Sequence, residues 1–295
     1  MVIVSKALPC IQQLIAEGIS PKDITDSTPQ GVNPLQIIVV NLMPMKEETE
    51  KDILRLLAAC AQWVKVTFLT MATHTSKHCT QAHLDAHYLQ FNQIASHTWD
   101  GMIITGAPVE HLPFEEVTYW KELCDIMDWA RLHVRSTMYI CWGAQAGLYH
   151  RYGIQKHAFQ PKKFGIFEHR ISSSKRPQIL NGWDDCCYIP HSRYTEVLQN
   201  EIEAVDTLEI PVISDEAGVY MVTEKNGNDI FLTGHAEYNK YTLHNEYQRD
   251  LAKGLHIDIP KNYYTHDNPE KEPIMRWKSC ANLLFHNWLK YYVSL

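Results

Sequence analysis

Short apolar runs alternate with helical stretches through the first half of the chain, and this alternation restricts the possible folds more than any other feature. The apolar runs are residues 35–42 (LQIIVVNL), 64–70 (VKVTFLT), 99–106 (WDGMIITG) and 136–141 (STMYIC). A run without polar alternation predicts a strand that is covered on both faces. Residues 48–61 and 115–134 have the spacing of amphipathic helices. Together they predict an α/β fold, a mostly parallel, doubly wound sheet with helices on both faces.

The remaining segments are arranged around this sheet. Residues 1–34 are expected to form an irregular N-terminal arm with one short helix, because prolines and a glycine interrupt any longer element. Residues 166–234 look rich in strands, and helical patterns return at about 240–253 and 276–293. We therefore predict a single domain over residues 35–295 that includes a C-terminal helical extension.

Charge and hydropathy argue against several classes of protein. The formal net charge of −7 gives no general attraction to nucleic acid or to an anionic membrane, so neither is expected as a partner. No apolar run approaches the length that crosses a bilayer. The N-terminus MVIVSKALPC lacks the apolar core of a signal peptide, and we expect a cytoplasmic protein.

Cysteine and histidine usage does not indicate a metal site. Eight cysteines are scattered without a CxxC pair, which favours reduced thiols over a disulfide framework. Four histidines recur along one segment without a convincing set of acidic or thiol ligands: His74, His78, His83 and His87. A solvated polar surface is the simpler interpretation, and we expect no bound metal.

Cys141 is the residue that most strongly indicates chemistry. It stands where the run 136–141 meets a predicted helix, and small residues follow it: Gly143, Ala144, Ala146 and Gly147. Small neighbours let the backbone turn sharply and let a substrate approach a nucleophile. The helix start favours a thiolate, and the N–H of Trp142 could form an oxyanion hole with that of Gly106 or Ala107. An arbitrary cysteine is usually a buried core residue, but this position favours a nucleophile.

The segment FLTGHAEY (231–238) offers a base and a partner for it. His235 follows a short apolar strand and a glycine, which places it at a strand end on the side where Cys141 is expected. Glu237 lies two residues further on, and in an extended chain positions i and i+2 face the same way. The carboxylate could then hold the imidazole and stabilise its charged form. Thiol, imidazole and carboxylate together predict a nucleophilic triad.

Longer stretches of the chain resemble the homoserine O-acyltransferase (homoserine trans-succinylase) family, whose flavodoxin-like fold is similar to that of class I glutamine amidotransferases. The matching stretches run from about residue 34 to 293 in the expected order: PLQIIVVNLMP, WDGMIITGAPVE, YICWGAQAGLYHRYGI, GIFEH, PHSRY, FLTGHAEY and RWKSCANLLFHNWLKYYV. The resemblance implies that Cys141 is the acyl-thioester nucleophile, His235 the proton acceptor and Glu237 its partner.

The same resemblance implies a site for two substrates. It implies that four residues line the amino-acid site: Lys46, Lys162, Ser192 and Arg249. Glu110 stands where succinyl-using members have glycine, so its carboxylate would repel a succinyl carboxylate and favour acetyl-CoA as the acyl donor. The resemblance further implies a homodimer without a tightly bound cofactor, in which acetyl-CoA is a co-substrate.

The resemblance leaves the acceptor open. Asn33 stands where family members usually have arginine, and Met45 replaces the first lysine of a pair. The expected activity is acetyl transfer to L-homoserine by a ping-pong route through acyl-Cys141, a step of methionine biosynthesis. Transfer to L-serine, which would serve cysteine biosynthesis, is the close alternative, because a pocket distinguishes one methylene by only about 1–3 kcal/mol. A glutamine amidotransferase-like cysteine hydrolase and a non-catalytic binding protein are more distant alternatives.

Overall fold

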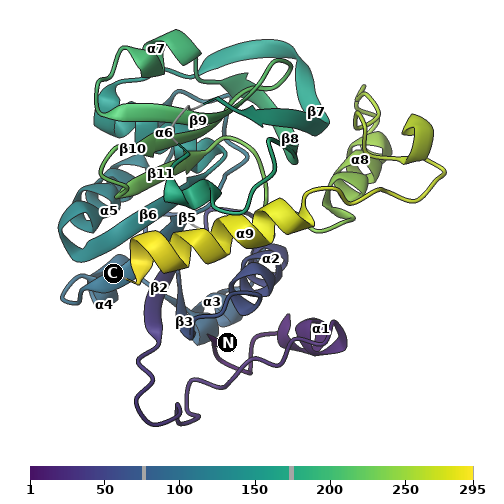
Figure 1. Cartoon of the computed structure of the whole chain (residues 1–295). Coiled ribbons are helices and arrows are strands. Elements are labelled where there is room, and N and C mark those ends of the chain that lie inside the picture. The colour runs from purple at the N-terminus through teal and green to yellow at the C-terminus, as the bar shows by residue number, and fades with distance from the viewer. Residues whose placement is uncertain (75–77, 173–175, 295) are drawn as a thin grey trace.

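The computed structural model describes residues 1–74, 78–172 and 176–294, and in these ranges one eleven-stranded sheet runs through the molecule (Figure 1). The strands lie in the order β1-β3-β2-β5-β6-β11-β10-β9-β7-β8, and β4 pairs with β3. Their bounds are Val2–Ile3 (β1), Leu35–Val40 (β2), Val64–Leu69 (β3), Tyr88–Leu89 (β4), Trp99–Ile104 (β5), Val134–Ile140 (β6), His157–Ile171 (β7), Cys186–Glu196 (β8), Leu208–Ser214 (β9), Gly218–Glu224 (β10) and Asp229–Leu232 (β11).

The pairing of the strands changes at β11. Along the path from β1 to β11 every neighbouring pair is parallel, and from β11 to β8 every neighbouring pair is antiparallel. The parallel half contains the four strands predicted from the apolar runs, and the predicted parallel α/β architecture is confirmed. Ile140 of β6 lies opposite Leu232 of β11. The carboxyl ends of these two strands therefore meet at the same edge of the sheet.

Helices cover both faces of the parallel half. Their bounds are Ile11–Ala16 (α1), Lys46–Ala58 (α2), Gln81–His87 (α3), Phe91–Ile94 (α4), Trp120–His133 (α5), Trp142–Tyr152 (α6), Gln199–Glu203 (α7), Thr242–Ala252 (α8) and Lys278–Trp288 (α9), with 3₁₀ turns at Phe114–Glu116, Gln178–Leu180 and Thr265–Asp267 and a π-helical turn at Leu289–Val293. Helices α2 and α9 pack on one face, and α5 and α6 pack on the other. Helix α8 projects beside the ends of β7 and β8 (Figure 1).

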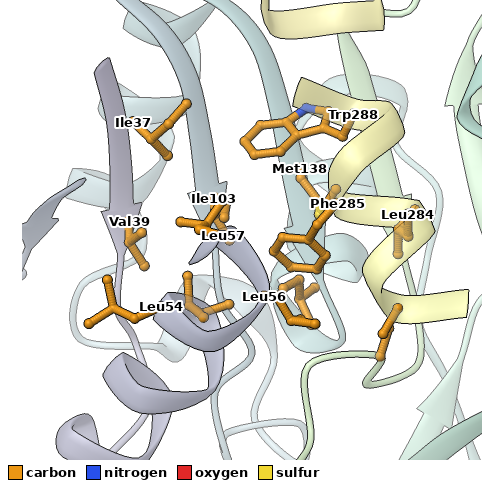
Figure 2. Packing of buried hydrophobic residues seen from close by; sticks show 14 of the residues in the cluster. Ile37, Val39, Leu54, Leu56, Leu57, Ile103, Met138, Leu284, Phe285 and Trp288 are labelled. Atoms are coloured by element: carbon orange, nitrogen blue, oxygen red, sulfur yellow. The ribbon is translucent and has the colours of Figure 1, made fainter. Parts of the chain in front are cut away.

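Alternate residues of the same strands fill the two faces. In β2, Ile37 and Val39 point to the face where Trp288 of α9 packs (Figure 2). Ile38 and Val40 belong to the cluster beneath α5 and α6. These four of the six β2 side chains are fully buried. Burial on both faces explains why this run has no polar alternation.

Two helix boundaries differ from the sequence prediction. The helix expected over 115–134 begins only at Trp120, because Phe114–Glu116 form a separate 3₁₀ turn after a proline. The helix expected over 48–61 occupies Lys46–Ala58. Within the described ranges no helix is long and apolar enough to cross a membrane.

The first 34 residues contribute to the edge of the sheet. Strand β1 pairs in parallel with β3, and its side chains Val2 and Ile3 are buried. Leu14 of α1 is also buried, in the cluster that contains α2. Strongly apolar side chains at these positions explain why the segment packs against the domain.

Candidate active site

A sharp turn places Cys141 between β6 and α6. Its backbone has φ 52° and ψ −116°, a conformation that few residues other than glycine adopt. Its N–H donates a hydrogen bond of 2.6 Å to the carbonyl of Leu232 on β11. A Cβ added to Gly143 would lie only 2.6 Å from the Thr105 carbonyl oxygen. Glycine at position 143 is therefore required for close packing of the turn against the end of β5.

His235 and Glu237 lie three and five residues beyond the end of β11. The Nδ1 atom of His235 is 2.6 Å from Oε1 of Glu237, and the backbone N–H of His235 donates to the Pro190 carbonyl at 2.8 Å. Tyr238 stacks on the imidazole with 4.0 Å between ring centroids. The two side chains meet because the chain turns at 236–237, and not through the extended geometry assumed from the sequence.

The charges around His235 favour its protonated form. Burial alone would lower the pKa of His235, but the negative charges of Cys141 and Glu237, which also hydrogen-bond to the ring, raise this pKa well above its usual range. The surroundings therefore favour the imidazolium form of the ring, which lies between a sulfur and a carboxylate. That arrangement suits a cysteine nucleophile, because the imidazolium stabilises a thiolate and can later donate a proton.

The turn after β5 lies against both Cys141 and His235. A Cβ added to Gly106 would be 3.2 Å from the Cys141 Cβ and 3.5 Å from the His235 Cε1. Ala107 follows in the same turn and is buried. Trp142 begins α6 directly after the nucleophile. Two of the residues expected to supply oxyanion-hole N–H groups, Gly106 and Trp142, thus adjoin Cys141, and Ala107 follows Gly106 in the chain.

Lys162, Ser192 and Arg249 come from three elements and meet at one carboxylate, Glu246 on α8. The Lys162 ammonium and the Ser192 hydroxyl donate to Glu246 Oε1 at 2.5 Å and 2.8 Å. Arg249 Nη2 lies 3.7 Å from the same oxygen. Arg249 also pairs with Asp250 at 2.7 Å, and about half of its side chain is exposed. Three of the four residues expected to line the amino-acid site therefore form one cluster.

Glu110 directs its carboxylate inward, toward β8 and α6. Its Oε2 accepts hydrogen bonds from the Tyr194 N–H at 2.8 Å and from the Thr195 hydroxyl at 3.3 Å. Thr195 is also 2.9 Å from the Gln145 side chain, which lies one helical turn after Cys141. These contacts connect Glu110 to the helix that carries the nucleophile.

Comparison with known proteins places the chain in a family. A family model described as homoserine O-succinyltransferase matches residues 1–295. The chain belongs to this family. A homoserine O-acetyltransferase of Bacteroides thetaiotaomicron is 51% identical over 97% of this chain and 93% of its own length. One of Brevibacillus brevis is 49% identical with the same coverage. As a member of the homoserine O-succinyltransferase family, the chain is an acyltransferase.

Solved structures of low sequence identity share the fold. A glutamine amidotransferase from Thermotoga maritima superposes with a TM-score of 0.59 at 10% identity, covering 89% of this chain and 100% of that one. A glutamine amido transferase from Methylobacillus flagellatus gives 0.54 at 12% identity, covering 88% and 95%. The expected class I glutamine amidotransferase-like fold is confirmed, and at these identities the likeness concerns the fold alone.

Within the described residues, Lys46 of this homoserine O-succinyltransferase family member makes its hydrogen bonds outside the Glu246 cluster. The side chain is buried, and its ammonium donates to the Asn41 carbonyl at 2.6 Å at the end of β2. Burial lowers the pKa of Lys46 to about 8, although the charges of Cys79 and Glu50 oppose this change. Lys46 is thus a buried cation at the carboxyl edge of the sheet.

Glu246 is a site residue that sequence reasoning did not identify. In the sequence it is one acid of a polar helix, three residues before Arg249. That i, i+3 spacing was the only local signal, and it is equally typical of a solvated helix surface. Among the residues with described positions, no group of three His, Cys, Asp or Glu side chains is arranged to hold a metal ion.

Proposed function

We propose that the enzyme transfers an acetyl group from acetyl-CoA to the hydroxyl of L-homoserine through an acyl-Cys141 intermediate. The observation that carries this proposal is the position of the His235 ring, which hydrogen-bonds to both Cys141 and Glu237 at the carboxyl edge of the parallel strands. Ligands of α/β sheets bind at that edge. A cytoplasmic location and a homodimer are parts of the proposal. The homodimer rests on the family resemblance, and light scattering of the purified protein tests it.

In the first half-reaction the Cys141 thiolate attacks the thioester carbonyl carbon of acetyl-CoA. The carbonyl electron pair moves to oxygen, where the N–H of Trp142 and that of Gly106 or Ala107 would stabilise the charge. Collapse of the intermediate breaks the bond to the CoA sulfur, which takes the proton from His235. The products are acetyl-Cys141, CoA thiol and a neutral imidazole.

In the second half-reaction the neutral His235 accepts the proton of the homoserine hydroxyl while its oxygen attacks acetyl-Cys141. Collapse expels the Cys141 thiolate next to the new imidazolium, which restores the starting state. Glu237 keeps the ring oriented and stabilises its positive charge in both steps.

The cluster around Glu246 supports an amino-acid acceptor. Its carboxylate is a natural partner for an α-ammonium group, and Lys162 and Arg249 are natural partners for an α-carboxylate. Arg249 is half exposed and could swing onto a substrate. L-serine would make the same contacts one methylene shorter, so it remains the runner-up acceptor.

The acyl donor is inferred from Glu110 and from the relatives. Its inward carboxylate disfavours a succinyl tail, which carries a second negative charge. The curated relatives at about half identity are named homoserine O-acetyltransferases. Both observations favour acetyl-CoA over succinyl-CoA.

The decisive experiment separates the two half-reactions. Enzyme mixed with acetyl-CoA alone should gain one acetyl group on the peptide that contains Cys141, while the peptide with the exposed Cys186 serves as an internal control. Homoserine added next should remove the acetyl group faster than serine does. Acetylation of Cys186 but not of Cys141 would disprove the covalent mechanism. Ammonia release from glutamine would instead favour a glutaminase.

A further inference from the structure

A hydrogen bond joins helix α2 to the turn that carries His235 and Glu237. The side-chain amide of Asn239 donates to Asp52 Oδ1 at 3.3 Å. Asp52 belongs to α2 and is only 4% exposed. On the other side, the indole N–H of Trp277 donates to the Tyr238 carbonyl at 2.8 Å. The residues immediately after the catalytic carboxylate are therefore held by hydrogen bonds to α2 and to Trp277 at the start of α9.

The attachment continues from α2 to the N-terminal segment. The Asp52 oxygen that accepts from Asn239 also accepts from Arg55 Nη1 at 2.8 Å. Arg55 then binds Glu17 with two parallel hydrogen bonds of 2.6 Å and 2.9 Å, the paired geometry that guanidinium and carboxylate groups favour. A chain of contacts, Glu17–Arg55–Asp52–Asn239, thus connects the segment after α1 to the catalytic turn.

An ordinary helix ion pair does not explain Asp52. The pKa of Asp52 is raised to about 7, mainly by burial and also by the negative charge of Glu237, while the hydrogen bond and charge of Arg55 and the Asn239 hydrogen bond oppose the increase. A buried carboxylate beside another carboxylate is costly unless it is well bonded. Asp52 is bonded to the one turn whose position the triad requires, and the chemistry itself does not use it.

We propose that Asp52 and Asn239 are positioning residues for Glu237, and that Arg55 and Glu17 hold Asp52 in place for this role. The inference rests on the proposed triad. Glu237 must keep its oxygen 2.6 Å from the imidazole, and Asn239 lies only two residues further along the same turn. Loss of the Asp52–Asn239 contact lets the turn move outward, which weakens the hold on His235 without touching either substrate.

The test compares Asn239→Ala with a matched control on the same helix, Lys51→Met. Lys51 also joins α2 to the N-terminal segment, through Gln13 at 2.7 Å, but among the described residues it makes no hydrogen bond to the catalytic turn. We expect kcat to fall about tenfold in Asn239→Ala, because a small displacement of a catalytic group strongly lowers the reaction rate. KM for both substrates should stay within about twofold of the wild-type value, because Asn239 is not among the residues proposed to bind either substrate. Lys51→Met should retain wild-type kcat.

A pH profile gives a readout that a purely structural role would not change. Asp52→Asn keeps the shape of the side chain and one acceptor oxygen but removes the charge. The groups that face Asp52 are Arg55, Asn239 and Glu237. An ionised carboxylate is the stronger acceptor, so wild-type kcat should rise as the pH passes through about 7. Asp52→Asn should lack this rise.

Alkylation of Cys141 by iodoacetamide, followed by peptide mass spectrometry, needs no substrate and separates this inference from the proposed function. Slower alkylation in Asn239→Ala than in Lys51→Met supports the inference even if the acceptor or donor is misassigned. The inference is overturned if the two variants match in kcat and in alkylation rate, if Asn239→Ala raises KM alone, or if the Asp52→Asn profile superimposes on the wild type.

Discussion

Replacing Glu110 should change which acyl donor the enzyme accepts. The Glu110 carboxylate is fixed by the Tyr194 N–H and the Thr195 hydroxyl, and Thr195 is joined to Gln145 on the nucleophile helix. A succinyl tail attached to Cys141 would bring a second carboxylate toward this fixed charge. Two like charges at about 4 Å and an effective dielectric near 20 repel by about 4 kcal/mol, or roughly a thousandfold in relative rate.

The observed preference should be smaller than this limit. The buried Arg193 guanidinium interacts electrostatically with both Glu110 and Cys141, and its positive charge would offset part of the repulsion. We therefore expect the wild type to prefer acetyl-CoA over succinyl-CoA by tens to hundreds of times in kcat/KM, on the order of 2–3 kcal/mol.

Two variants separate charge from space. Glu110→Gln removes the charge and keeps an acceptor for the Tyr194 N–H, whereas Glu110→Gly also removes the side chain. If charge controls selection, both variants should accept succinyl-CoA, with homoserine preference unchanged. If the volume of the side chain controls donor choice, only Glu110→Gly should accept succinyl-CoA. A donor ratio that stays at the wild-type value in both variants would refute the role of Glu110.

Other predictions concern the triad and its packing. Cys141→Ala should abolish transfer and acyl-enzyme formation while thermal unfolding stays close to wild type; measurable turnover by this variant would contradict the covalent route. His235→Asn should reduce kcat more than Glu237→Gln, because the histidine moves protons in both half-reactions and the carboxylate only orients it; the reverse order would reverse these roles. Gly147→Ala puts a methyl group 2.8 Å from the buried Phe231 ring, so urea unfolding should show about 1–2 kcal/mol lower stability after the gain in helix propensity. An unchanged unfolding midpoint would mean that the ring moves freely.

The parts of the structure that were predictable are those set by local patterns. The fully apolar run 35–42 predicted a strand buried on both faces, and β2 is such a strand. The end of β6 predicted a sharp turn at Cys141, because small residues follow it. Local pattern also predicted that His235 and Glu237 meet, although the actual turn differs from the assumed extended chain.

The parts that were not predictable depend on distant segments. Glu246 acquires its partners from β7, β8 and α8. No sequence pattern near Glu246 indicates that Lys162 or Ser192 will bind it. Likewise, Asp52 and Asn239 are far apart in the chain and meet only when α2 packs beside the catalytic turn. Polar contacts of this kind are settled by tertiary packing, which a hydrophobic pattern does not encode.

The pairing of β6 with β11 has a consequence for how activity appears during folding. The nucleophile follows Ile140 and the base lies shortly after Leu232, and these two residues are opposite each other in the sheet. A slip of one residue in this pairing would turn alternate side chains to the other face and separate the two catalytic groups. The pairing also joins segments that are distant in the chain, so it forms at a high cost in loop entropy. Recovery of catalysis after denaturation therefore requires that β6 and β11 pair in this register.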